Sequence, residues 1–194
     1  MTSALDYIFS DPKLRAFAVR FRGVLWVLIA LLLLWGLGID KEKFWLAFTV
    51  SMLGECMQLW CFASLDKNST LAFRGPYAFV RNPMYLGRYF IILGVLLLVD
   101  DWLAPVLAIY SLLYWFYMSN RVKREEALLK QVFDQAYSDY CREVRPFLPR
   151  LTPYRDSTVA FWDWRLFRNA HGPANLAATL GGFVVIYGLL QYFA

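Results

Sequence analysis

Five stretches of apolar residues alternate with charged segments along this chain of 194 residues. They cover residues 24–39, 44–65, 84–99, 102–118 and 174–194. A helix needs roughly 20 residues to cross the hydrocarbon core of a bilayer, so the pattern predicts about five transmembrane helices. The third stretch is short and is closed by Asp100, so it must borrow residues before Met84 or lie partly buried in protein.

The basic residues between these stretches predict the orientation of the chain. Of the 20 Lys and Arg, 18 fall in residues 1–22, 66–88 and 119–170, which share one side of the membrane if the five spans alternate. Lys41 and Lys43 alone face the other side. The positive-inside rule therefore predicts a cytoplasmic N-terminus and a C-terminus on the far side. The first stretch lacks an A-x-A-like cleavage site and precedes further spans, so we interpret it as a span and not as a signal peptide.

Composition supports a membrane protein. Hydrophobic residues make up 59% of the chain and charged residues 18%, whereas soluble domains have about 45–50% and about 25%. The core of one soluble domain of this size cannot bury so many hydrophobic residues. The net charge of +5 fits contact with anionic lipid and topology signals better than nucleic-acid binding. Three cysteines and the single His171 favour neither a disulfide framework nor a metal site.

Two further segments have the pattern of interfacial helices. Residues 5–21 carry apolar side chains on one helical face and basic side chains that reach headgroups. In residues 161–168, aromatic side chains interleave with Arg165 and Arg168, as in an aromatic belt. Membrane anchoring is the simpler interpretation of both, and the wall of a lipid entry path is the alternative.

The loop before the third stretch contains candidate anion-binding groups. Its Gly75-Pro76 and Asn82-Pro83 pairs are turn signals, and Pro83 suits the first turn of a helix. Free N–H groups and the positive dipole at a helix start favour a carboxylate or phosphate, and Arg81 and Arg88 add formal charge nearby. A basic loop that only sets topology would have a similar composition.

The segment after the fourth stretch carries two carboxylates on what should be the same helix continuing out of the membrane. Arg121 and Glu125, and Glu126 and Lys130, are both spaced i,i+4, which is typical of salt bridges on an exposed helix. Close to the basic loop, however, Glu125 or Glu126 could bind a cationic or hydroxyl-bearing ligand, as carboxylates bind ribose hydroxyls in nucleotide sites.

Taken together, the two segments resemble the superfamily of isoprenylcysteine carboxyl methyltransferases and phospholipid methyltransferases. The resemblance rests on Gly75-x-Tyr77, Arg81-Asn82-Pro83-Met84-Tyr85-x-Gly87, two intervening spans, Arg124-Glu125-Glu126, and a tail with Phe133, Tyr137, Tyr140, Arg142, Val144-Arg145-Pro146 and Pro149. It covers about residues 68–150, and the order and spacing of its short motifs are specific.

The resemblance implies a small helical membrane enzyme that transfers a methyl group from S-adenosylmethionine to a lipidic acceptor. The cofactor pocket would lie on the cytoplasmic side, between the loop before the third span and the helix after the fourth. The expected cofactor-binding residues are Tyr77, Arg81, Asn82, Pro83, Tyr85, Gly87, Glu125 and Glu126. The expected catalytic residues are Arg81, Glu126 and Arg145, and the expected substrate-binding residues are Arg88 and Arg124; no metal is expected.

One residue departs from the isoprenylcysteine branch. That branch typically has His where Asn82 stands, whereas Asn-Pro-Met-Tyr also resembles the phospholipid N-methylating branch. Asn82 can hydrogen-bond a cofactor but cannot titrate near neutral pH. O-methylation of a carboxylate or phosphate, held by arginines, needs no general base; N-methylation of an ethanolamine needs one, for which Glu126 is the candidate.

Two other functions compete with methyl transfer. A membrane sterol-reductase-like enzyme would use a nicotinamide cofactor, although the single histidine makes a His-centred proton relay hard to build. A non-enzymatic scaffold or lipid-binding protein would carry the motifs by chance. The sequence divides into residues 1–65 (interfacial helix and two spans), 66–150 (methyltransferase core with two spans) and 151–194 (interfacial segment and last span).

The expected location is a bacterial inner membrane, or the endoplasmic reticulum in a eukaryote. The bilayer and a membrane lipid or prenylated substrate are the expected partners, and no nucleic acid is expected. Gly181-Gly182 and Gly188 in the last stretch allow close helix packing within or between chains, so the oligomeric state stays open.

Overall fold

The computed structural model describes residues 38–66, 71, 73–155 and 157–192. The expected interfacial helix 5–21 and nearly all of the first apolar stretch lie outside these residues. The described part is helical and contains no strand, only an isolated bridge between Ile39 and Val99. Its elements are α3 (Phe44–Ser64), the 3-10 turn η1 (Gly75–Ala78), α4 (Pro83–Leu96), α5 (Leu103–Glu143), α6 (Trp164–Asn169) and α7 (Gly172–Tyr192).

The helices follow the expected apolar stretches closely. α3 and α7 have 21 residues each and are apolar and long enough to cross a membrane. α4 is apolar but has 14 residues, about 21 Å at 1.5 Å per residue, short of a core of about 30 Å. The fourth stretch forms the first part of α5, which continues without a break into the charged segment. The described residues thus contain two helices that are both long and apolar enough to cross a membrane, and five spans stay a prediction.

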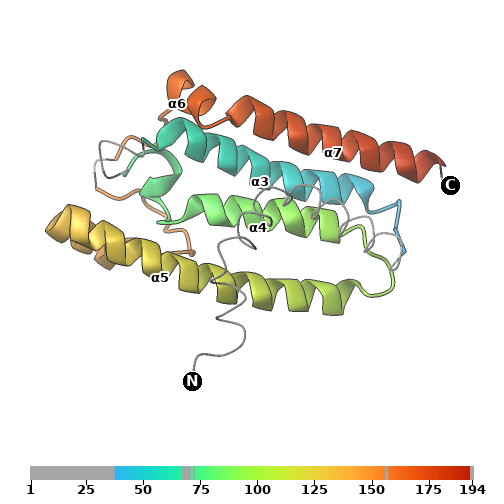
Figure 1. Ribbon diagram of the computed structural model, residues 1–194, viewed down its shortest axis with the longest axis horizontal. Coiled ribbons are helices and arrows are strands. Elements are labelled where there is room, and N and C mark those ends of the chain that lie inside the picture. Colours follow the sequence, from blue (N-terminus) through green and yellow to red (C-terminus); the bar gives the residue numbers. More distant parts are fainter. Residues whose placement is uncertain (1–37, 67–70, 72, 156, 193–194) are drawn as a thin grey trace, which may run out of the picture.

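α4 lies between α3 and α5, and α7 runs along the opposite side of α3 (Figure 1). α3 and α4 approach so closely that side chains are excluded at Gly54, Gly87 and Gly94. A Cβ on Gly54 would lie 2.5 Å from the Gly87 carbonyl oxygen, and one on Gly94 would collide with Ser51 and the Ala47 carbonyl. Small residues at such crossings let two backbones pack directly in a membrane. The short α4 is therefore partly buried against α3, as its length requires.

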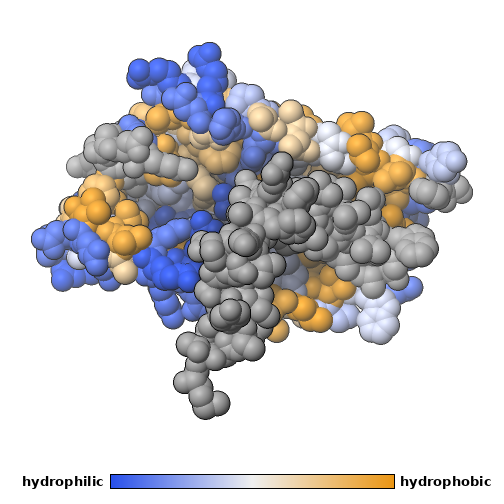
Figure 2. Space-filling model, in the orientation of Figure 1, coloured by the Kyte–Doolittle hydropathy of each residue, from blue (hydrophilic) through white to orange (hydrophobic). Residues whose placement is uncertain are grey.

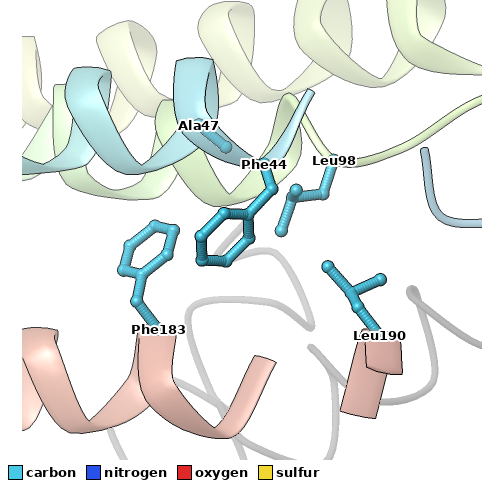
Figure 3. Packing of buried hydrophobic residues seen from close by; sticks show 5 residues of the cluster. All are labelled: Phe44, Ala47, Leu98, Phe183 and Leu190. Atoms are coloured by element: carbon cyan, nitrogen blue, oxygen red, sulfur yellow. The ribbon is translucent and has the colours of Figure 1, made fainter. Parts of the chain in front are cut away.

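Aromatic and aliphatic side chains join α7 to the start of α3. Phe44 contacts Phe183 edge-on with ring centroids 6.0 Å apart, and Leu98 and Leu190 complete a buried cluster (Figure 3). At Gly181, Gly182 and Gly188 an added Cβ would meet no described residue within 4 Å. Among the described residues, α7 therefore packs along one stripe only.

A carboxylate is buried in the middle of α3. Glu55 is fully inaccessible, and its Oε2 accepts a hydrogen bond of 2.9 Å from the Thr179 hydroxyl of α7. Its Oε1 has no hydrogen-bond partner among the described residues. Ionisable groups at such positions are costly in a membrane unless they are paired or neutral, so Glu55 and Thr179 form a polar link that fixes α7 in register on α3.

At the far end of the bundle, charged side chains connect the start of α3 to the end of α4. Lys43 lies 2.9 Å from Asp40 and 3.7 Å from Asp100, and the Asp40 amide donates to the Leu98 carbonyl. Hydrogen bonding to Lys43 lowers the pKa of Asp40, and the same contact raises the pKa of Lys43. This cluster links the start of α3 to the residues that follow α4.

α5 is interrupted by one residue. Asp134 has φ 43° and ψ −118°, which separates the helix into residues 103–133 and 135–143. A non-glycine residue in this region of φ/ψ space is strained. After the break, Tyr137, Tyr140 and Val144 pack with Tyr154 in a second buried cluster. The interruption thus turns the end of α5 into a wall of the cleft described below.

α6 caps the other end of α3. Asp163 accepts hydrogen bonds from the amides of Arg165 and Leu166, which start the helix and lower the pKa of the Asp163 carboxyl. Trp162, Trp164 and Phe167 form a ring cluster with centroid separations of 5.2–5.6 Å. Hydrophilic residues gather over α6 and over the C-terminal half of α5 (Figure 2). That distribution is the one expected of an interfacial segment, and its anchoring role stays a prediction.

Candidate active site

A cleft of about 370 Å³ opens where the loop before α4 meets α5. The volume lies within the range of roughly 300–1,000 Å³ that is usual for small-molecule sites. Its polar and charged lining residues are Asp66, Tyr77, Arg81, Asn82, Tyr85, Arg88, Arg121, Glu125, Tyr137 and Tyr140. Its apolar lining residues are Leu65, Leu71, Met84, Leu129 and Phe133. One cleft therefore combines charges, phenol groups and an apolar wall.

The loop of the cleft is held by the chain that follows α5. Backbone hydrogen bonds run from Arg81 to Arg145 (3.0 Å), Asn82 to Pro146 (3.2 Å), Arg150 to Phe79 (2.9 Å), Tyr154 to Ala78 (2.9 Å) and Gly75 to Thr158 (2.9 Å). The Asn82 side-chain amide also donates to the Pro146 carbonyl at 3.2 Å. The two segments run along each other over most of the loop, which fixes the backbone that carries the candidate site residues.

Gly75 is required at the entry to this loop. Its φ of +60° is a left-handed conformation, and an added Cβ would collide with Ser64 at the end of α3. Glycine adopts this conformation at little cost. The Gly75-Pro76 turn therefore starts the 3-10 turn η1 and directs Tyr77 into the cleft.

Arg81 and Glu126 form a nearly buried ion pair. The Arg81 Nη1 lies 2.9 Å from the Glu126 Oε1, and the two side chains are 10% and 18% exposed. Nη1 also donates to the Cys141 Sγ at 2.6 Å. The Arg81 Nε has no hydrogen-bond partner among the described residues. A buried guanidinium N–H without an acceptor is costly, so it is available to a ligand with an anionic or carbonyl oxygen.

Glu125 belongs to a second network on the facing wall. The Tyr85 hydroxyl lies 2.8 Å from both Glu125 oxygens, and the Arg121 Nε donates to Oε1 at 2.9 Å. The Tyr114 hydroxyl donates to the Tyr85 carbonyl at 2.6 Å, which ties the start of α4 to α5. The two adjacent carboxylates of α5 thus hold different segments. Glu126 pairs with Arg81 of the loop, and Glu125 accepts a hydrogen bond from Tyr85 of α4.

Three tyrosines, Tyr77, Tyr137 and Tyr140, line the cleft. The Tyr140 hydroxyl donates to the Tyr77 carbonyl at 2.6 Å. Burial raises the pKa of Tyr77 and of Tyr140 above the usual tyrosine value. Burial, together with the nearby Glu126 carboxylate, raises the pKa of Tyr137 as well. All three therefore stay neutral at physiological pH and act as hydrogen-bond donors and aromatic faces.

The structure brings most of the expected site residues together. Lining the cleft are Tyr77, Arg81, Asn82, Tyr85, Arg88 and Glu125, with Glu126 directly behind Arg81. Pro83 is buried at the first turn of α4, where it was expected.

Three expected site residues lie elsewhere. Gly87 faces α3, where an added Cβ would lie 2.8 Å from Gln58 and from the Gly54 carbonyl. The Arg124 side chain is exposed on α5 and does not line the cleft. The Arg145 side chain is exposed too, and only its carbonyl contributes, by accepting the Arg81 amide.

Sequence reasoning treated Arg121 only as a salt-bridge partner and assigned no site role to Leu129, Phe133, Tyr137 and Tyr140, all of which line the cleft. For Arg121, Leu129 and Phe133 the available signal is a spacing in multiples of four, since such residues share one helical face. Tyr137 and Tyr140 lie beyond the interruption at Asp134 and were marked only by the family resemblance. Leu71 and Asp66 carry no pattern that distinguishes them.

The fold and the site define a helical protein with two helices long and apolar enough to cross a membrane, and with a cleft lined by charged, phenolic and apolar side chains. The family model for phospholipid methyltransferases matches residues 43–136, from the residue before α3 into the last part of α5. Together with the relatives below, this match supports the assignment of the chain to the superfamily of isoprenylcysteine carboxyl methyltransferases and phospholipid methyltransferases.

The relatives carry two kinds of name. The chain is 33% identical over 84 residues to the protein-S-isoprenylcysteine O-methyltransferase of Schizosaccharomyces pombe, which covers 43% of this chain and 35% of that protein. It is 30% identical over 120 residues to the cobalt-zinc-cadmium resistance protein CzcN of Cupriavidus metallidurans (59% and 54%). It is 29% identical over 166 residues to the nickel-cobalt-cadmium resistance protein NccN of Alcaligenes xylosoxydans (78% and 76%).

The match thus spans about a third of the Schizosaccharomyces pombe protein and about half of CzcN. No solved structure gives a significant match. Within the described residues, no group of three or more His, Cys, Asp or Glu side chains is placed to hold a metal ion.

Proposed function

We propose that this protein transfers the methyl group of S-adenosylmethionine to an oxygen of a membrane-embedded lipidic acceptor, a carboxylate or a phosphate. The single observation that carries the proposal is the cleft of about 370 Å³ in which both family motifs meet, with Arg81 paired to Glu126 and Tyr85 to Glu125. Membership of a methyltransferase superfamily supports the reaction class.

The residues of the cleft fit this cofactor chemically. S-adenosylmethionine is a sulfonium cation with a carboxylate tail and ribose hydroxyls. Tyr77 and Tyr85 offer aromatic faces to a cation, and Glu125 offers a carboxylate to hydroxyls. Arg81, whose Nε has no acceptor among the described residues, and the amides at the start of α4 suit the carboxylate tail. The apolar wall formed by Leu129 and Phe133 suits an adenine ring.

The protein would act by alignment and exclusion of water. S-adenosylmethionine supplies a methyl group that is transferred in line, and an anionic oxygen attacks it without losing a proton. The acceleration then depends on holding the acceptor and the methyl carbon in contact and away from bulk water. Arg81 and Glu126 are nearly buried, and Glu126 would orient the Arg81 guanidinium. The Arg145 carbonyl holds the backbone of Arg81 by accepting its amide hydrogen bond.

N-methylation of a phosphatidylethanolamine-type lipid is the second candidate. The match to the phospholipid methyltransferase model favours it. An ammonium acceptor must lose a proton before it attacks, and Glu126 is the carboxylate placed to accept that proton. In the structure Glu126 is engaged by Arg81 at 2.9 Å, which supports the assignment of Glu126 to positioning and favours O-methylation.

We infer a multi-pass protein with the cleft on the cytoplasmic side of a bacterial inner membrane or of the endoplasmic reticulum. The basic residues around the cleft and the positive-inside rule support this orientation. The acceptor would then enter from the cytoplasmic leaflet.

Calorimetry on the purified full chain tests the cofactor assignment. Wild-type protein should bind S-adenosylhomocysteine and not NADP, and Arg81→Ala should weaken S-adenosylhomocysteine binding. Arg142→Gln is the matched control, because the Arg142 side chain is 74% exposed and, among the described residues, forms an ion pair with Asp139 alone. Binding of NADP in place of S-adenosylhomocysteine would favour a reductase, and binding of neither would favour a lipid-binding scaffold.

A further inference from the structure

Arg88 differs from the other arginines of the cleft in its partners. Arg81 pairs with Glu126, and Arg121 pairs with Glu125. The one hydrogen bond that Arg88 forms with a described residue runs to the Met84 Sδ, 3.7 Å away, and none of the ion pairs among the described residues includes it. Arg88 lines the cleft together with the carboxylates Asp66 and Glu125, yet it is paired with neither.

The lack of a described ion-pair partner is energetically costly at the position of Arg88. The residue is half-buried on the apolar helix α4, five residues after Pro83, which is about 8 Å along the helix axis. Its guanidinium lies 5.8 Å from the centre of the Tyr85 ring. A guanidinium at membrane depth is expensive unless it meets an anion or water, and the described protein groups offer it no oxygen.

The surroundings of Arg88 suit an amphiphile. On the side of the cleft, Arg121 approaches the same Tyr85 ring to 5.6 Å, so two guanidinium groups flank one phenol. The apolar side chains of Leu65, Met84 and Leu129 line the same cleft. The cleft therefore offers both charged and apolar groups, which matches a polar head followed by an apolar tail.

We infer that Arg88 binds the anionic head of the acceptor and thereby selects carboxylate- or phosphate-bearing amphiphiles over ammonium-bearing ones. The planar guanidinium can hold either anion through two parallel hydrogen bonds. An ammonium head would be repelled by Arg88 and Arg121, and the Glu125 carboxylate is already shared by Tyr85 and Arg121. This assignment rests on the proposed function and adds the residue that determines its substrate class.

The test measures binding to the full-length protein in detergent, with three single-chain amphiphiles of matched length. One carries a carboxylate (an S-farnesylated N-acetylcysteine), one a phosphate (farnesyl phosphate) and one an ammonium (farnesylamine). Wild-type protein should bind at least one anion at least tenfold more tightly than the ammonium. Arg88→Gln should weaken anion binding by about 10- to 100-fold, the range expected for hydrogen bonds to a charged group, and Arg88→Lys by less.

Two controls separate this role from cofactor binding and from folding. Arg88→Gln should keep the affinity for S-adenosylhomocysteine within twofold of wild type, which also shows that the variant folds. Arg142→Gln should leave all affinities unchanged. Unchanged anion binding in Arg88→Gln, equal loss of S-adenosylhomocysteine binding, or a wild-type preference for the ammonium would each overturn the assignment.

Failure of the proposed function gives a different result. If wild-type protein binds the anions through Arg88 but transfers no methyl group to them, the anion site stands and the methyltransferase does not. If the carboxylate and phosphate differ in affinity, the tighter one identifies the head group.

Discussion

The ion pair between Arg81 and Glu126 should be the strongest energetic coupling in the cleft. The two groups are 2.9 Å apart and 10% and 18% exposed. Removing one partner of a buried pair leaves an unpaired charge and costs about 3–5 kcal/mol. Arg81→Ala should therefore lower the free energy of unfolding by about that amount. Glu126→Gln leaves the Arg81 charge without its partner and should lower the free energy of unfolding by a similar amount.

A double-mutant cycle separates the pair from its surroundings. Arg81→Gln and Glu126→Gln each strand one charge, whereas the double variant replaces both charges with neutral amides that can still bond. The double variant should be more stable than the sum of the single effects predicts, by about 1.5–3 kcal/mol. The free energy of unfolding is measured in mixed micelles by denaturant titration, followed through tryptophan fluorescence.

The exposed pair of Arg142 and Asp139, 3.3 Å apart, provides the comparison. The same cycle there should give less than about 1 kcal/mol, as exposed pairs do. Additive effects at Arg81 and Glu126, within about 0.5 kcal/mol, would refute the reasoning, because they would mean that the two charges do not interact.

Three further predictions concern packing, hydrogen bonding and pH. Gly54→Val should destabilise the fold by about 1–3 kcal/mol because its side chain meets α4 backbone at 2.5 Å, whereas Gly181→Val, at a site where an added Cβ meets no described residue within 4 Å, should be neutral in the same thermal unfolding assay; equal melting temperatures would contradict the close α3–α4 crossing. Tyr140→Phe should cost about 1–3 kcal/mol, because it leaves the buried Tyr77 carbonyl without its donor, and should weaken S-adenosylhomocysteine binding; unchanged affinity and stability would show that this hydrogen bond is unimportant. The Asp163 carboxyl, whose pKa is lowered by the amides of Arg165 and Leu166, should stabilise α6 above the ordinary aspartate pKa and lose that effect as the pH falls through the lowered value; Asp163→Asn should remove this acid dependence from the thermal midpoint, and an unchanged dependence would argue against the cap.

The helix positions could be predicted from hydropathy because apolar runs translate directly into buried or lipid-facing segments. The stretch 44–65 is α3, and 174–194 corresponds to α7 with a shift of two residues at each end. Pro83 begins α4 as its fixed φ requires. The short stretch 84–99 packs closely against α3 because three glycines at the α3–α4 crossing leave no side chain between the backbones. The sequence suggested this burial only through the short length of the stretch.

The site could be predicted in part, because charges and turn residues mark it. Arg81 and Glu126 were expected in one pocket, and they form its ion pair. The interruption at Asp134 and the pairing of residues 145–158 with the loop depend on tertiary contacts without local sequence signal. For this reason Arg145 was expected to act through its side chain, whereas its carbonyl makes the contact, and Gly87 was expected at the cofactor, whereas it packs on α3.

The most direct test of methyl transfer uses S-adenosylmethionine with an isotopically labelled methyl group, the purified full chain and lipid extracted from host membranes. Labelled methyl should enter the organic-soluble fraction with wild-type protein, and mass spectrometry should locate it as an ester on a carboxylate- or phosphate-bearing lipid. Glu126→Gln, shown to fold by its melting curve, should transfer almost none, and Arg142→Gln should match wild type. Labelled lipid formed equally by wild type and Glu126→Gln would contradict the site, and no labelled lipid from a wild-type protein that folds would contradict the proposed function.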